Sequence, residues 1–264
     1  MCHEHLTAPI RGGAGIVEER VEVPGADRAI PAYVARPEEG TAPGVLIIHD
    51  VWGANPFYHD VARRLAGEGF AVLLPDFFVR EGALEEQTRD AAMARRARHD
   101  QTKAVADVAG ALGWLREHPA TTGKVGTVGF CMGGTLVFLA AAREPLPDAS
   151  VAFYGFPVPK TTELAPLVPL DEAERVRSPL LALWGDQDQG VGMENVERYR
   201  DALMRAGAQH EFVVYPGPGH GFLTFDPTAP SFVEAQDAWG RTVAFLRTTL
   251  TPGPSPAPLD RGAS

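Results

Sequence analysis

Short apolar runs alternate with longer amphipathic segments along most of the chain. The runs hold mainly branched and aromatic side chains, which is typical of buried parallel strands. The longer segments carry apolar residues at helical spacing, so the pattern predicts strands that alternate with helices. The predicted strands span 45–48, 70–74, 124–128, 151–154, 180–184 and 212–215, and the predicted helices span 57–68, 89–117, 134–143, 194–206 and 231–250.

Two further strand-like segments, 16–23 and 32–36, come before these and predict an antiparallel hairpin at one edge of the sheet. The expected fold class is therefore α/β, with a mostly parallel sheet of about eight strands and helices on both faces. The segment 89–117 is long enough to break into two helices. The proline-rich segment 157–179 predicts an irregular excursion over the sheet.

The domain organisation follows from this pattern and from the length of 264 residues. One core is the expectation for a chain of this size. We predict a single domain over 16–250, a flexible N-terminal lead-in over 1–15 and a disordered tail over 251–264, where prolines occupy every second position from Pro252 to Pro258.

Composition narrows the class of partner. The chain is 45% apolar and 22% charged, as soluble globular proteins are, and its net charge of −10 disfavours binding to nucleic acid or anionic membranes. No apolar run approaches the length of a membrane span, and the N-terminus shows no secretory signal. With only Cys2 and Cys131, a disulfide framework is not expected. These observations predict a cytoplasmic monomer or small homo-oligomer that acts on small molecules.

The sharpest local motif is Gly-Phe-Cys-Met-Gly-Gly over 129–134, directly after the predicted strand 124–128. A strand that turns abruptly into a helix can present a nucleophile at its apex, and small neighbours prevent clashes in that turn. Cys131 would then lie at a helix N-terminus, which favours a thiolate. The alternative is a buried structural cysteine in a glycine-rich turn.

An acid and a base follow the cysteine in the order that such nucleophiles require. Asp186 and Asp188 come after the strand 180–184, and His220 comes after the strand 212–215. We assign His220 as the general base and Asp188 as the carboxylate that orients it. Asp186 follows its strand more closely and is expected to order the turn.

The sequence resembles the dienelactone hydrolases, a family with the α/β-hydrolase fold, from about Ile16 to Leu250. The resemblance rests on the segments 48–55 (Ile-His-Asp-Val-Trp-Gly-Ala-Asn), 74–78 (Leu-Pro-Asp-Phe-Phe), 123–126, 129–134, 154–155, 185–188 and 219–222. It implies a triad of Cys131, His220 and Asp188 with no metal or organic cofactor. The family also has an acidic residue, usually glutamate, at the position of Asp50, and this residue helps to form the thiolate. Asp50 is shorter, and its alternative role is to order the turn 50–55.

The oxyanion donors are expected to be the backbone N–H groups of Met132 and Val51, which follow the nucleophile and the third predicted strand. The resemblance further implies two arginines that grip a substrate carboxylate. Arg89 is the counterpart of the first, with Arg80 as a competing choice, and Thr224 stands where the family has the second. The aromatic residues expected to line the pocket are Trp52, Phe78, Tyr154 and Phe222.

Three other features are interpreted without a catalytic role. The basic cluster of Arg95, Arg96, Arg98 and Lys103 is expected to be a solvated helix face. Cys2, His3 and His5 are too few for a metal site, so we assign no metal ligand. The glycines at 12, 13 and 15 lack the lysine of a phosphate loop.

These observations predict a hydrolase that cleaves a small lactone or an activated ester through an acyl-thioester. Two alternatives stay open. A general carboxylesterase with a neutral pocket is favoured by Thr224, and a noncatalytic ligand-binding protein of the same fold would need none of the triad.

Overall fold

Parallel strands form most of the single sheet in the computed structural model, which describes residues 15–251. The lead-in predicted over 1–15 and the tail predicted over 251–264 therefore lie outside the described residues, except for Gly15 and Thr251. The strand order is β1-β2-β4-β3-β5-β6-β7-β8. The strands are β1 (Ile16–Pro24), β2 (Ala29–Pro37), β3 (Ala42–Ile48), β4 (Ala71–Pro75), β5 (Thr121–Phe130), β6 (Ala149–Phe153), β7 (Leu180–Gly185) and β8 (His210–Tyr215).

The hairpin of β1 and β2 forms the antiparallel edge of this sheet. β1 pairs antiparallel with β2, and β2 pairs antiparallel with β4, whereas every later pair is parallel. The predicted α/β class, with about eight mostly parallel strands, is confirmed. The carboxyl ends of the parallel strands share one edge, where open α/β sheets bind their ligands.

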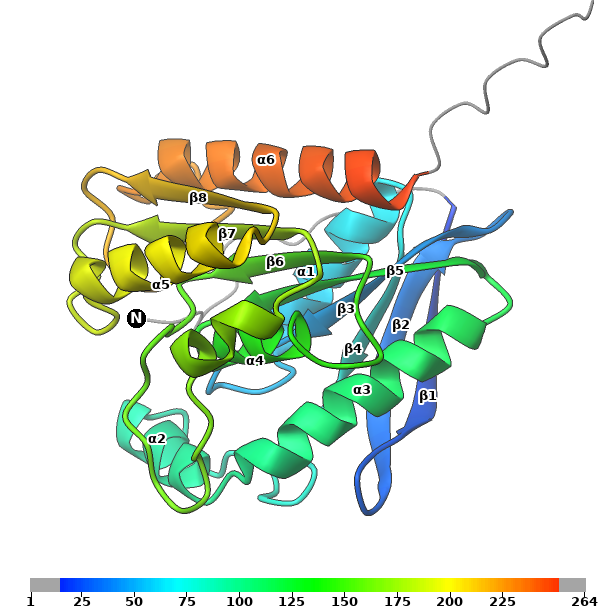
Figure 1. Cartoon of the computed structure of the whole chain (residues 1–264). Coiled ribbons are helices and arrows are strands. Elements are labelled where there is room, and N and C mark those ends of the chain that lie inside the picture. The colour runs from blue at the N-terminus through cyan, green and yellow to red at the C-terminus, as the bar shows by residue number, and fades with distance from the viewer. Residues whose placement is uncertain (1–14, 252–264) are drawn as a thin grey trace, which may run out of the picture.

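Helices cover both faces of the sheet (Figure 1). One face is covered by α1 (Pro56–Gly67) and α6 (Phe232–Leu250), and the other by α3 (Gln101–Glu117), α4 (Met132–Ala140) and α5 (Met193–Ala206). A short helix, α2 (Arg89–Ala97), lies to one side of the sheet (Figure 1). This double cover explains why the central strands are almost continuously apolar.

The structure refines three sequence predictions. The predicted helix 89–117 breaks into α2 and α3, and the Asp100 side chain caps α3 by accepting from the Thr102 and Lys103 amides. The predicted helix 134–143 begins two residues earlier, because the chain turns at Cys131 and α4 starts on the next residue. The predicted excursion 157–179 contains one 3-10 helix, η1 (Pro169–Arg175).

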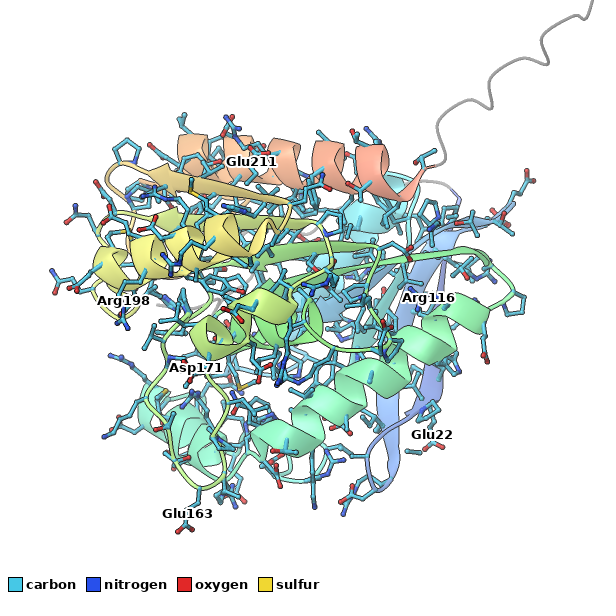
Figure 2. All side chains as sticks on the ribbon, viewed as in Figure 1. Glu22, Arg116, Glu163, Asp171, Arg198 and Glu211 are labelled. Atoms are coloured by element: carbon cyan, nitrogen blue, oxygen red, sulfur yellow. The ribbon has the colours of Figure 1, made fainter. Side chains whose placement is uncertain are left out.

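Several charged side chains lie at the periphery of the molecule. Figure 2 shows Glu22, Glu163 and Arg198 pointing away from the ribbon, and all three are exposed. Within 15–251, no helix combines the length and the hydropathy needed to cross a membrane.

Candidate active site

Cys131 stands at the apex of the turn between β5 and α4. Its backbone has φ 56° and ψ −115°, a conformation that non-glycine residues rarely adopt and that only a constraining turn maintains. Close approach of the chain demands glycine nearby, since a Cβ at Gly133 would lie 2.0 Å from the carbonyl oxygen of Ile48. The glycine-rich motif therefore makes the strained turn that the sequence predicted.

The main chain around Cys131 is fixed from both sides. Its N–H donates to Phe153 O at 3.0 Å on β6, and its carbonyl accepts from the Thr135 amide at 3.1 Å. The Thr135 hydroxyl also accepts from the Phe156 amide at 3.0 Å, a link that sequence patterns did not indicate. The cysteine is 7% exposed at the N-terminus of α4, where helix amides favour negative charge on sulfur.

Asp188 and His220 form a hydrogen-bonded pair at the ends of β7 and β8. His220 Nδ1 lies 2.7 Å from Asp188 Oδ2, and Asp188 Oδ1 accepts from the amides of Gly190 and Val191 at 3.1 Å each. The Asp188 side chain is fully buried, whereas that of His220 is 23% exposed. A carboxylate at Nδ1 places the proton there, so Nε2 carries the lone pair that a general base needs.

The two loops that carry this pair are joined directly. The Gln187 amide donates to Pro218 O at 3.0 Å, and the Gly217 amide donates to Asp186 Oδ1 at 2.8 Å. A Cβ at Gly185 would lie 2.1 Å from Pro218 O, so only glycine allows the loops to approach this closely. The Asp186 side chain thus links its own turn to the loop that carries His220.

Aromatic rings surround His220. The Tyr154 ring meets the imidazole edge-on at a centroid distance of 5.0 Å, and the Phe156 ring lies at 5.3 Å. Phe222 packs against Tyr154 at 5.7 Å. Tyr154 has φ 39°, a second strained residue at this edge of the sheet. Tyr154 and Phe222 thus lie beside the candidate base; the Tyr154 side chain is fully buried, and that of Phe222 is nearly so.

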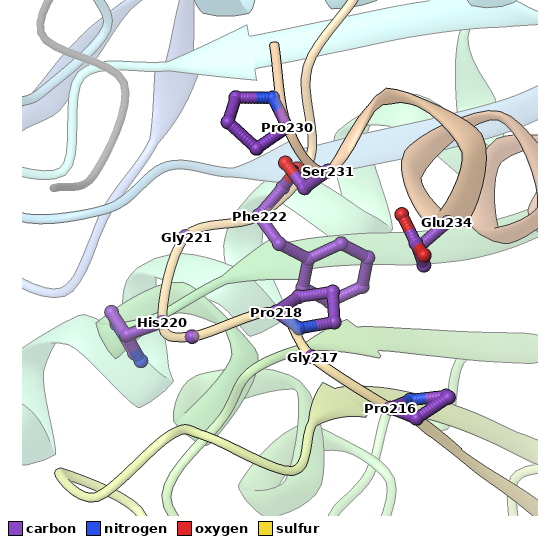
Figure 3. A pocket seen from close by; sticks show the side chains of 10 residues that line it. Pro216, Gly217, Pro218, His220, Gly221, Phe222, Pro230, Ser231 and Glu234 are labelled. Atoms are coloured by element: carbon purple, nitrogen blue, oxygen red, sulfur yellow. The ribbon is translucent and has the colours of Figure 1, made fainter.

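A cavity of about 460 Å³ opens on one side of the His220 loop. It is lined by residues 216–222 and by residues 230, 231 and 234. Figure 3 shows His220 at one end of this lining and Glu234 at the other, with the Phe222 ring between them. The described lining comes from the His220 loop and the start of α6, so the cavity adjoins the base.

Asp50 orders the loop that follows β3. Its buried Oδ1 accepts from the Trp52 amide at 2.8 Å, and its own amide donates to Tyr58 Oη at 3.3 Å. Gly53 N–H donates back to Asp50 O at 3.2 Å. The loop that carries the Val51 amide is therefore closed by Asp50, which supports the turn-ordering alternative. Trp52, predicted in the pocket, is largely buried in this loop.

His49 connects this loop to the end of β4. Nδ1 donates to Asp50 O at 2.8 Å, and Nε2 accepts from the Phe77 amide at 3.1 Å. Burial lowers the pKa of His49 to about 4, so the imidazole is neutral and serves as a fixed bridge. The sequence analysis did not assign this residue a role.

Arg95 corrects the interpretation of the basic cluster. It is only 5% exposed, whereas a solvated helix face was predicted. Its Nη2 donates to Val51 O at 3.0 Å and its Nη1 donates to Gly82 O at 3.2 Å. Ala92, Arg95 and His99 recur at helical spacing and are all buried. This spacing could have indicated that the Arg95 side chain points into the protein.

Phe78 is buried next to Arg95, which contacts the loop that carries Val51. The ring is 0% exposed and is packed by His49, by His99 and by the Arg95 guanidinium, which lies 4.1 Å from the ring centroid. The prediction that Phe78 lines the pocket is wrong, because its neighbours make it a core residue.

The arginines predicted to grip a carboxylate have different surroundings. Arg80 forms two hydrogen bonds with the buried carboxylate of Asp107, at 2.6 and 2.9 Å, and a third with Asp27 at 2.8 Å. Arg89 is exposed at the first turn of α2. Thr224 is half-buried, and its hydroxyl accepts from the Asp226 amide at 3.1 Å.

No group of three or more His, Cys, Asp or Glu side chains among residues 15–251 is arranged to hold a metal ion. Cys2, His3 and His5, to which we assigned no metal ligand, lie outside the described residues.

Comparison with known proteins gives a consistent result. The sequence profile of the dienelactone hydrolase family matches residues 30–250. The carboxymethylenebutenolidase of Rhodococcus opacus is 32% identical over 256 residues, which cover 96% of this chain and 99% of that protein. A solved structure from Klebsiella pneumoniae, provisionally described as a dienelactone hydrolase, has 30% identity and a TM-score of 0.80, with 87% of this chain and 98% of that chain covered. A dienelactone hydrolase from Anabaena variabilis, 24% identical with a TM-score of 0.66 and coverage of 89% and 99%, shares the fold.

Proposed function

Because the chain belongs to the dienelactone hydrolase family and is a carboxylic ester hydrolase, we propose that it opens a small enol lactone, or cleaves an activated ester, by covalent catalysis at Cys131. In this proposal His220 is the general base, and Asp188 orients it. The backbone N–H groups of Met132 and Val51 hold the oxyanion.

The strained conformation of Cys131 carries the proposal. A buried structural cysteine gains nothing from φ 56° at the apex of a strand–helix turn, whereas a nucleophile gains exposure to a bound carbonyl. The hydrogen-bonded pair of Asp188 and His220 at the same sheet edge supports the assignment.

The reaction divides into two displacements. The thiol proton moves to His220, and the Cys131 sulfur attacks the carbonyl carbon, so that a C–S bond forms and the carbonyl electron pair moves onto oxygen. Collapse of this tetrahedral species breaks the ester C–O bond and gives an acyl-thioester, while the leaving oxygen takes the proton from His220. Water then gives a proton to His220 and attacks the thioester carbon; the C–S bond breaks, the proton returns from His220 to the Cys131 sulfur, and the acid is released.

The leaving group decides the preferred substrate. A thiolate is itself a good leaving group, so the tetrahedral species expels sulfur more readily than a simple alkoxide. An enolate leaves with less difficulty, which favours an enol lactone or an aryl ester over an alkyl ester. We also propose a cytoplasmic location, because a reducing compartment keeps such a thiol active.

The proposal is tested by turnover of an enol lactone and of p-nitrophenyl acetate with wild type, Cys131→Ala and Cys2→Ser. Both activities should fall at least about 1,000-fold in Cys131→Ala and stay near wild type in Cys2→Ser. Unchanged turnover in Cys131→Ala would refute the covalent mechanism.

A second substrate class is favoured by Thr224, which cannot pair with a carboxylate as arginine does. In this version the triad is the same, and the pocket takes a neutral ester. A carboxylated lactone analogue would then fail to compete with p-nitrophenyl acetate, whereas an anion-binding pocket would give strong competition.

A further inference from the structure

A buried guanidinium lies directly behind the loop that carries the Val51 amide. Arg95, on α2, reaches the loop with Nη2 at 3.0 Å from Val51 O and reaches the connection before α2 with Nη1 at 3.2 Å from Gly82 O. One side chain therefore joins two segments that lie 31 positions apart in sequence.

The position of the guanidinium is set on several sides. It stacks on the buried Phe78 ring at 4.1 Å, and His49 packs against that ring at 5.4 Å. Gly53 has φ +83°, and a Cβ there would lie 3.2 Å from Arg95 Nη2. A side chain at Gly53 would thus be strained and would also crowd the guanidinium.

The charge of Arg95 is compensated only at a distance. Its described hydrogen bonds go to main-chain carbonyls, and within residues 15–251 its buried Nε has no hydrogen-bond partner. Asp50, Asp76 and Glu81 attract it through space, although Glu81 already pairs with His99 at 3.1 Å. Burial lowers the pKa of Arg95, yet a guanidinium stays protonated at neutral pH.

A buried cation that contacts carbonyls is costly, so a role beyond packing is indicated. We propose that Arg95 is a positioning residue for the oxyanion hole. Its bond to Val51 O fixes the peptide after Val51 and, through the Val51 backbone, the direction of the Val51 N–H. Its charge also favours negative charge that develops on the substrate oxygen. The inference rests on the proposed function, in which the Val51 amide is an oxyanion donor.

A purely structural role for Arg95 predicts a different result. Acylation of Cys131 by an ester builds an oxyanion, whereas alkylation of the same thiol by iodoacetamide builds none. Loss of a structural link would slow both reactions of Cys131 together. Loss of oxyanion positioning would slow acylation alone.

The experiment uses the full chain in a Cys2→Ser background, with Arg95→Met, Arg95→Lys and the exposed control Arg98→Met. Acylation by p-nitrophenyl acetate is followed before steady state, and alkylation of Cys131 by iodoacetamide is followed by mass spectrometry. Acylation should fall about 10- to 100-fold in Arg95→Met, with alkylation within about twofold of the parent protein. The acylation rate of Arg95→Lys should lie between those of Arg95→Met and the parent protein, because lysine keeps the charge and loses the planar fork. Arg98→Met should match the parent.

Equal slowing of acylation and alkylation in Arg95→Met, or no slowing of either, would overturn the inference. Circular dichroism and the melting temperature identify variants that fail to fold. If Arg95→Met fails to fold, the acylation and alkylation rates of Arg95→Lys are compared with those of the parent protein instead. If prior alkylation of Cys131 in the parent protein leaves esterase turnover intact, the proposed function fails, and this inference fails with it. The two failures are therefore distinguishable.

Discussion

At the scale of the residue, Asp50 has two candidate tasks, loop ordering and thiol activation, and a single substitution can separate them. Its Oδ1 accepts from the Trp52 amide at 2.8 Å, a bond that a neutral side-chain amide could also make. Thiol activation instead requires a carboxylate that attracts or exchanges a proton. Asp50→Asn keeps an acceptor for the Trp52 amide and removes the carboxylate that thiol activation would need.

We predict that Asp50→Asn keeps the melting temperature within a few degrees of wild type and slows alkylation of Cys131 at pH 7 by about tenfold. The rate–pH profile of alkylation should move to higher pH, because the thiol would lose a group that promotes its ionisation. The measurement is iodoacetamide alkylation between pH 5 and pH 9.

Asp50→Glu is the matched comparison, since it restores the residue that the family usually has. It should alkylate at least as fast as wild type if the carboxylate activates the thiol. An Asp50→Asn profile that superposes on wild type would assign Asp50 to loop ordering alone.

At the scale of the element, His49 connects the carboxyl ends of β3 and β4. The neutral ring donates to Asp50 O and accepts from the Phe77 amide, so protonation would break the second contact. Its pKa of about 4 lies below the ordinary value of 6.5 because the ring is buried. Between these values the unfolded chain binds a proton that the folded protein does not.

The free energy of unfolding should therefore fall as pH falls from about 6.5 to about 4, by at most about 3 kcal/mol from His49. Burial also lowers the pKa values of His59 and His118, which adds to the slope in the same direction. Urea denaturation of wild type and His49→Gln at several pH values separates the His49 contribution. The variant should be less stable at pH 7 and should show a shallower slope; parallel slopes would contradict the assignment.

The strands could be predicted because buried parallel strands are apolar on both faces, so β3, β6 and β7 appear as continuous runs. The helix α2 was predicted from residue 89 onward, but the burial of Arg95 on it was not. Its buried face includes Arg95, which a hydrophobic pattern counts as polar and assigns to solvent. The acceptors that allow this burial, Val51 O and Gly82 O, are main-chain atoms and leave no trace in the sequence.

At the scale of the whole molecule, topology brings the candidate triad together. Strand order places β5, β6, β7 and β8 side by side, so residues 131, 188 and 220 reach one edge of the sheet. Their chain order and strand-end positions were predictable from sequence. Arginine placement depends on long-range partners, and the sequence left Arg80 and Arg89 as competing choices for that reason.

Arg80 and Arg89 can be distinguished experimentally, because Arg80 pairs with a buried carboxylate that is distant in sequence. Arg80 is 11% exposed and Asp107 is 0% exposed, and Asp107 Oδ1 also accepts from the Ala26 amide at 2.7 Å in the hairpin turn between β1 and β2. Arg80→Met leaves a buried carboxylate without its cation. It should lower the free energy of unfolding by about 3 kcal/mol or more and leave the KM of the folded enzyme unchanged.

Arg89→Met should have the opposite profile, because Arg89 is exposed at the start of α2. Its stability should stay within about 0.5 kcal/mol of wild type, and the KM for a carboxylated lactone should rise while that for p-nitrophenyl acetate stays the same.

The double variant Arg80→Met/Asp107→Leu should recover part of the stability that Arg80→Met loses, since no buried charge is left unpaired. A selective rise in KM with Arg80→Met would instead place the carboxylate-binding group at Arg80, and urea denaturation combined with steady-state kinetics on both substrates distinguishes the two assignments.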